Sequence, residues 1–96
     1  MKGLNYTYHQ IVQKEKEKFK EFCSTLNAYD FGNVIHIIHE DCSTFILHNA
    51  VMWKSEVLDE HEIPKFIGVS TEHNGDFFFF AGDLTSWRVL KNTIEY

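Results

Sequence analysis

The sequence predicts a single α+β domain spanning residues 1–96, with one long N-terminal amphipathic helix packed on an antiparallel sheet of about four to five strands. Three features of the chain predict this class. Apolar residues recur at helical spacing over residues 8–26, and β-branched and aromatic residues dominate residues 34–53. An Asn-Gly pair then separates two further apolar runs, which is typical of a hairpin.

The predicted helix begins at Thr7 and ends near Asn27. Thr7 and Gln10 match a capping box, in which each side chain bonds an otherwise free backbone amide at the helix start. Glu15 interrupts the apolar face where another apolar residue is expected. The apolar face itself contains Tyr8, Ile11, Val12, Phe19, Phe22, Cys23 and Leu26.

The first two strands are expected at residues 34–39 and 42–53, with Glu40-Asp41 between them. If this pair forms a two-residue turn, His36 lies opposite Phe45. Apolar residues occur on both faces of these strands. We therefore expect them to lie centrally in the sheet or to be covered by another chain, either a partner or the second subunit of a homodimer.

The clearest hairpin signal is Asn74-Gly75, which suits a type I′ turn because both of its central positions need positive φ. This turn places Thr71 opposite Phe78. Phe78 and Phe80 then share the core face of the sheet. Because side chains alternate between faces, the opposite face carries Phe77 and Phe79.

Residues 84–94 allow two interpretations. Asp83 can cap a helix, but Thr85, Trp87 and Val89 equally suit a strand. The pattern slightly favours a strand over residues 86–90, after a turn at Gly82 and Asp83.

Charge is unevenly distributed along the chain, whose formal net charge is −5. Residues 1–29 carry five Lys against three Glu, whereas residues 30–62 carry seven acidic residues against Lys54 alone. An acidic segment repels phosphate, so we expect no nucleic-acid partner. It attracts a basic protein instead.

Cysteine usage and hydropathy favour a cytoplasmic location. Cys23 and Cys42 do not make a disulfide framework. The first ten residues lack the apolar run of a secretory signal, and no stretch approaches the about 18 apolar residues of a membrane span.

Candidate metal-binding and catalytic residues do not form a convincing site in the sequence. His36, His39, Cys42 and His48 lie close together in the chain, but His36 and His39 should point to opposite faces of a strand. No Gly-rich phosphate loop and no signature of a cysteine nucleophile occurs. We therefore expect no catalytic residue and no cofactor.

Two features indicate protein binding. Four carboxylates lie within seven residues before Pro64, and such a patch attracts a basic surface. Two phenylalanines lie on the sheet face that the helix need not cover. The predicted partner-binding residues are Glu56, Asp59, Glu60, Glu62, Phe77 and Phe79.

In its size, acidity and these six residues, the chain resembles the small cytoplasmic immunity proteins that bacteria use against their own secreted nuclease toxins. The resemblance implies that carboxylates occupy the cationic site where the toxin would bind nucleic-acid phosphate. The alternative is a small-molecule-binding or enzymatic α+β domain with a pocket between helix and sheet. Its polar groups would be His36, His48 and Tyr8.

Strand alternation leads to a first prediction, that the protein holds no stoichiometric metal. Elemental analysis of protein purified without added metal tests this. One tightly held zinc per chain would show the alternation argument to be wrong.

Overall fold

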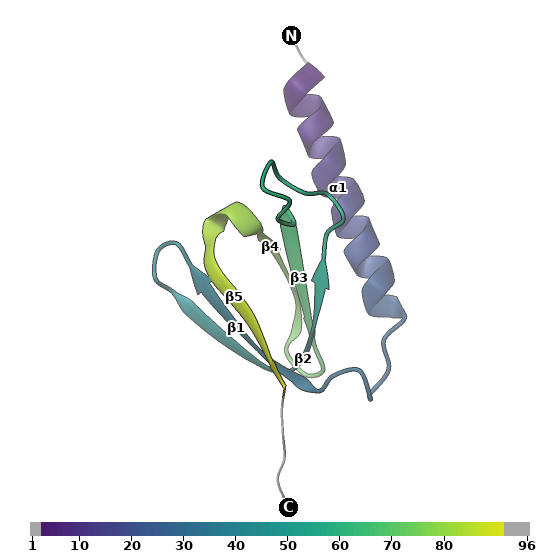
Figure 1. Ribbon diagram of the computed structural model, residues 1–96. Helices are drawn as coiled ribbons and strands as arrows, with labels where there is room; N and C mark the ends of the chain where they lie inside the picture. Colours follow the sequence, from purple (N-terminus) through teal and green to yellow (C-terminus); the bar gives the residue numbers. More distant parts are fainter. Residues whose placement is uncertain (1–2, 92–96) are drawn as a thin grey trace, which may run out of the picture.

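A computed structural model describes residues 3–91 and confirms the α+β class (Figure 1). One helix precedes a five-stranded antiparallel sheet, and a short 3₁₀ turn lies between the last two strands. The elements are α1 (Gly3–Ser24), β1 (Asn33–His39), β2 (Thr44–Lys54), β3 (Phe66–Thr71), β4 (Gly75–Phe80), η1 (Ala81–Asp83) and β5 (Leu84–Lys91).

The sheet is curled into a partly open barrel. Its strand order is β4-β3-β2-β1-β5, so the two edge strands follow each other in sequence and are joined by the three residues of η1. So short a connection brings the ends of β4 and β5 together, as Figure 1 shows. The amide of Ala81 donates to the carbonyl of Lys65, and the amide of Glu40 donates to the carbonyl of Asp83. These two bonds hold η1 to both sides of the curled sheet.

Strand β2 bends at Asn49, and this bend allows the curl. Asn49 has a positive φ of 50°, and the register of β1 against β2 shifts between Asn33 and Ile35. Asn tolerates this backbone region better than most residues, and a bulge increases local twist. Before the bend β2 pairs with β1, Ala50 just after it pairs with both β1 and β3, and the rest of β2 pairs with β3 as far as Lys54.

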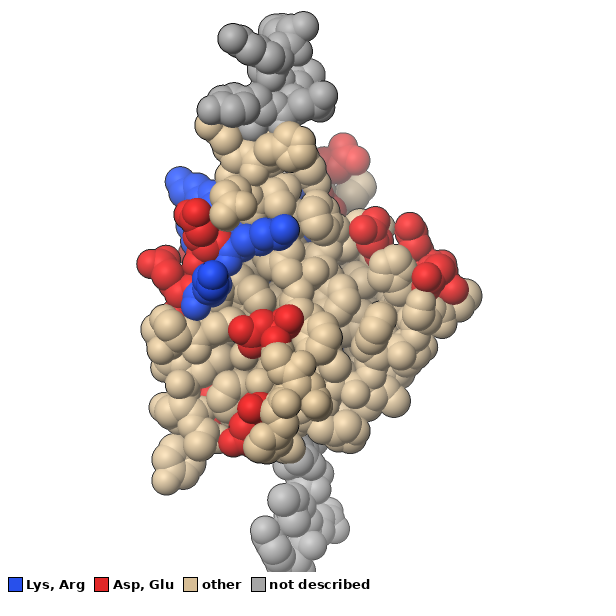
Figure 2. Space-filling view, turned by 180° about the vertical axis from the view of Figure 1, so that it is seen from behind, with Lys and Arg blue, Asp and Glu red and all other residues tan. Residues whose placement is uncertain are grey.

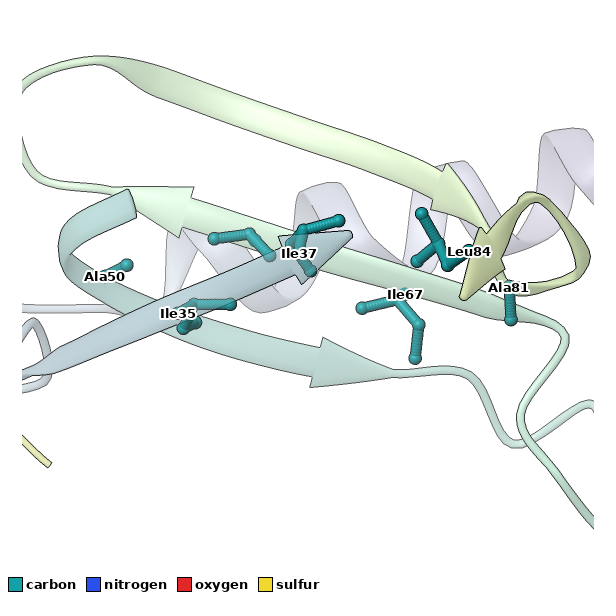
Figure 3. Packing of buried hydrophobic residues seen from close by; sticks show 7 residues of the cluster. Ile35, Ile37, Ala50, Ile67, Ala81 and Leu84 are labelled. Atoms are coloured by element: carbon teal, nitrogen blue, oxygen red, sulfur yellow. The ribbon is translucent and has the colours of Figure 1, made fainter. Parts of the chain in front are cut away.

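The hydrophobic core lies inside the curled sheet (Figure 3). It combines side chains from β1, β2, β3 and β5 with one from η1. Each fully buried isoleucine in it contributes about 1.5–3 kcal/mol relative to an exposed side chain. The core residues are Ile35, Ile37, Ala50, Ile67, Val69, Ala81 and Leu84.

Helix α1 packs on the outer face of the sheet, over β3. The Phe19 ring lies directly on Gly68, where an added Cβ would come within 2.5 Å of the ring. Trp53 and Phe78 flank Phe19, with ring centroids 5.5 and 6.1 Å away. Gly68 therefore sets how closely the helix approaches the sheet.

Glu15, which interrupts the apolar face of the helix, is buried with 2% of its surface exposed. Its carboxylate accepts a 2.6 Å hydrogen bond from the Ser55 hydroxyl, and Lys18 lies 3.5 Å away. The same hydroxyl accepts a bond from the amide of Val57. Glu15 is thus a polar attachment between the helix and the segment that follows β2.

The structure confirms the predicted helix and strands but corrects their boundaries. The helix begins at Gly3 and ends at Ser24, so Thr7 lies inside it and does not cap it. Residues 84–91 form strand β5, which agrees with the favoured interpretation of that segment.

Both predicted hairpin registers are wrong, because each turn is longer than two residues. His36 lies opposite Ile46 rather than Phe45. In the second hairpin Thr71 pairs with Gly75, which has φ 87°, while Asn74 lacks the positive φ that a type I′ turn needs. This change exchanges the faces of β4: Phe78 and Phe80 point outward beside the helix, whereas Phe77 and Phe79 point toward the core.

The close approach of α1 to β3 leads to a second prediction. Gly68→Ala should lower the free energy of unfolding by about 1–3 kcal/mol, because the added methyl group overlaps the Phe19 ring and the helix must move away. Chemical denaturation measures this loss. Gly32→Ala is the matched control, since nothing lies within 4 Å of its Cβ position. Equal stability of the two variants would contradict the packing described.

Candidate functional site

The four predicted carboxylates lie in residues 55–65, which connect β2 to β3 and are called the acidic loop below. The loop is folded by its own hydrogen bonds. The amide of Asp59 donates to the carbonyl of Ile63, and the amide of Lys65 donates to that of Val57, both at 2.8 Å. Leu58 and Pro64 form an isolated bridge between its two arms. The loop is therefore an ordered hairpin-like structure.

Asp59 has a structural role in this loop. Its carboxylate oxygen Oδ1 accepts hydrogen bonds from the amides of His61, at 2.7 Å, and Ile63, at 3.0 Å. The bond from Ile63 is the main cause that lowers the pKa of Asp59 from its ordinary value. Next to Ile63, Glu62 adopts φ 63° and reverses the chain.

The other three acidic residues of the loop are exposed. Glu60 lies 3.6 Å from the ring of His61, which is itself exposed. The carboxylates of Glu56 and Glu62 have no ion-pair or hydrogen-bond partner within residues 3–91, so they are available to a cation. The sequence predicted the same role for all four carboxylates. In the structure Asp59 orders the loop, whereas the other three face solvent.

A groove of about 560 Å³ runs beside the acidic loop. Helix α1, the loop, η1 and the start of β5 meet there. Tyr8 comes from the helix and Trp87 from β5, and Asp59 and Lys65 are charged groups of its wall. The remaining lining residues are Ile63, Pro64, Phe66, Phe80, Ala81, Gly82, Asp83, Leu84 and Thr85.

Sequence patterns did not predict η1 and Trp87 as parts of the site. They follow the acidic loop by about sixteen and twenty-two residues in the sequence, and the curl of the sheet brings them beside it. The Gly82-Asp83 turn was visible in the sequence, but its position against the loop depends on which strands form the sheet edges.

Phe77 and Phe79 are half-buried on the inner face of β4 and pack against the core. Their rings stack on each other with centroids 6.4 Å apart, and Phe79 lies 6.1 Å from Phe45 of β2. Phe45 keeps 39% of its surface exposed. These rings form a second, aromatic patch, and neither Phe77 nor Phe79 lines the groove.

The histidines and cysteines do not converge on one site. Tyr8 lines the groove, as the small-molecule alternative expected, but His36 and His48 do not. Within residues 3–91 no group of three or more His, Cys, Asp or Glu could hold a metal ion. Burial raises the pKa of the Cys23 thiol, which makes it a weaker nucleophile at neutral pH.

Comparison of the chain with family models, curated protein sequences and solved structures gives no match. In the part of the chain that the structure describes, no helix is long and apolar enough to cross a membrane. An aromatic-lined hollow beside exposed carboxylates suits binding of a cationic or amphipathic group.

The hydrogen bonds of Asp59 lead to a third prediction. Asp59→Ala should speed hydrogen exchange at the amides of His61 and Ile63, because both lose their acceptor. Glu60→Ala is the control, since Glu60 accepts no backbone bond within residues 3–91.

The same carboxylate should make the loop sensitive to acid. Its pKa is lowered in the folded loop, so its stabilising effect is complete above about pH 4 and is lost as pH falls through the lower, folded value. Carboxyl chemical shifts recorded by NMR against pH measure this. An Asp59 titration at or above the ordinary value would contradict the loop geometry.

Proposed function

We propose that the chain is a non-catalytic protein-binding module that neutralises a basic partner through the acidic loop. One observation carries the proposal: the loop is ordered by its own hydrogen bonds and presents Glu56, Glu60 and Glu62 to solvent beside an aromatic-lined groove. An ordered loop loses little conformational entropy on binding. The backbone that carries its carboxylates is therefore already ordered before a partner binds.

The groove supplies what an acidic patch alone lacks, a place for a side chain of the partner. Interfaces depend on a few anchor residues that enter well-packed pockets, while surrounding charges steer the encounter. An arginine or lysine that enters between Tyr8 and Trp87 would lie near aromatic rings and the carboxylates of Asp59 and Asp83.

The kind of partner that best fits is a basic nuclease, such as the secreted toxins that small immunity proteins inhibit. Exposed carboxylates would occupy the cationic surface that the nuclease uses for phosphate. In this proposal the chain acts in the cytoplasm. The half-buried Phe77 and Phe79 and the more exposed Phe45 would form a secondary contact on the open side of the sheet.

A specific observation also supports a second candidate, the binding of a small molecule. The groove volume of about 560 Å³ lies within the range of roughly 300–1,000 Å³ typical of ligand pockets. Trp87 fluorescence in a Trp53→Phe background separates the candidates. Quenching by a metabolite fraction free of protein would favour this second function.

The exposed carboxylates lead to a fourth prediction. A variant with Glu56, Glu60 and Glu62 all replaced by Ser should fold normally, because all three side chains are exposed. Its association with the partner recovered from the native host should be slowed about tenfold or more at low ionic strength, because electrostatic steering is lost.

The measurement is association kinetics at low and high salt. The matched control replaces Glu17, Glu21 and Glu72, which are exposed acids outside the loop. If the loop variant and the control associate at the same rate and show the same salt dependence, the loop is not the binding surface.

A further inference from the structure

A second surface, far from α1, has the opposite chemistry to the acidic loop. It is the outer side of the three strands β2, β1 and β5 before the bend of β2. Strand pairing places Ile46, His36 and Arg88 in one row across it, because directly paired residues share a face. We call it the basic sheet face. Its members are Val34, His36, Ile38, Thr44, Ile46, Ser86, Arg88 and Leu90.

Four of the eight residues of the basic sheet face are aliphatic, and four of the eight are exposed. Ile46 keeps 56% of its surface exposed and Leu90 keeps 46%, although both occupy regular strands. Helix α1 packs over β3 and leaves β1 and β5 bare, as Figure 1 shows. Ile46 and Leu90 lie on β2 and β5, on either side of β1, whose half-buried Val34 and Ile38 share the same face. A contiguous exposed apolar patch of this kind marks an interaction surface.

The charge of this face is unusual for the chain. None of its eight residues is acidic, and it carries Arg88, the single arginine of an acidic protein. The lysines of α1 differ, because glutamates alternate with them along the helix. Figure 2 shows blue and red side chains intermingled over the helix.

We propose that the basic sheet face binds the acidic loop of a second copy of this chain. The acidic loop carries exposed carboxylates, and the basic sheet face carries none. Leu58 and Ile63 expose 47% and 40% of their surfaces, and Glu56 and Glu60 flank them. Leu58 and Ile63 would pack on Ile46 and Leu90, while Arg88 meets one of the carboxylates.

The contact has to form between copies. Within one chain the loop is attached to β3 by the Ser55–Phe66 backbone bond and to α1 by the Ser55–Glu15 hydrogen bond. Its groove faces η1 and the start of β5, not the outer side of β1. Two copies can each place a loop on the face of the other, or copies can associate head to tail.

This self-association needs no other protein, so it goes beyond the proposed function. It uses the same loop, and a basic partner would compete with it. Self-association is measured on the purified chain alone, whereas partner binding requires the partner to be added. Failure of one proposal can therefore be distinguished from failure of the other.

The test is sedimentation velocity of the purified full chain over a range of concentrations. The native chain should form species larger than a monomer as concentration rises. Arg88→Glu should weaken this association about tenfold or more, because it opposes the carboxylates of the loop. Lys14→Glu is the matched control, with the same charge change on an exposed position of α1, and it should associate as the native chain does.

A rescue variant and an apolar variant complete the test. Adding Glu60→Arg to Arg88→Glu should restore association, because the charge pair is rebuilt with its signs exchanged. Ile46→Ser should weaken association without a change in circular dichroism, since the side chain is mainly exposed. A native chain that stays monomeric at every concentration overturns the proposal. The proposal is also overturned if neither Arg88→Glu nor Ile46→Ser changes the association. That result would indicate that another surface, such as the unpaired edge of β4, forms the contact.

Discussion

The structure depends on the short connection between β4 and β5. These strands form opposite edges of one five-stranded sheet, yet three residues join them. In a flat five-stranded sheet the two edge strands would lie about four strand spacings apart, roughly 19 Å. A connection of three residues is too short to span that distance. The sheet has to curl, and Asn49 provides the bend in β2 that makes the curl possible. The curl encloses the core and places η1 beside the acidic loop, where the groove lies.

The outer surface is divided by the position of the helix. Phe19 can lie on β3 because residue 68 is glycine, and the aromatic rings around it cover that side of the sheet. Glu15 then connects the helix to Ser55, the first residue of the acidic loop. Helix packing and loop order are thus coupled, because a buried carboxylate that loses its hydrogen-bond partner is costly. The strands that the helix leaves bare form the basic sheet face.

Two surfaces of opposite chemistry therefore belong to one small domain. The acidic loop carries exposed carboxylates beside a groove, and the basic sheet face carries exposed aliphatic side chains around Arg88. A chain of 96 residues cannot bury all its apolar side chains, since a small domain keeps a large part of its surface exposed. Much of the exposed remainder lies on β2 and β5 and on the acidic loop, at Phe45, Ile46, Val89, Leu90, Leu58 and Ile63.

The sequence by itself determined the helix, the strands and the segment that holds the acidic loop, because periodicity and turn residues act over a few neighbouring positions. It could not determine strand register: the turn at residues 72–74 pairs Thr71 with Gly75 rather than Phe78, and this odd shift of three positions moved Phe77 and Phe79 from the outer face to the core side of β4. Nor could it explain Glu15, whose partner Ser55 lies forty residues away. Tertiary structure alone decided that Trp87 and Tyr8 meet the acidic loop at one groove, because that meeting requires the sheet to close on itself.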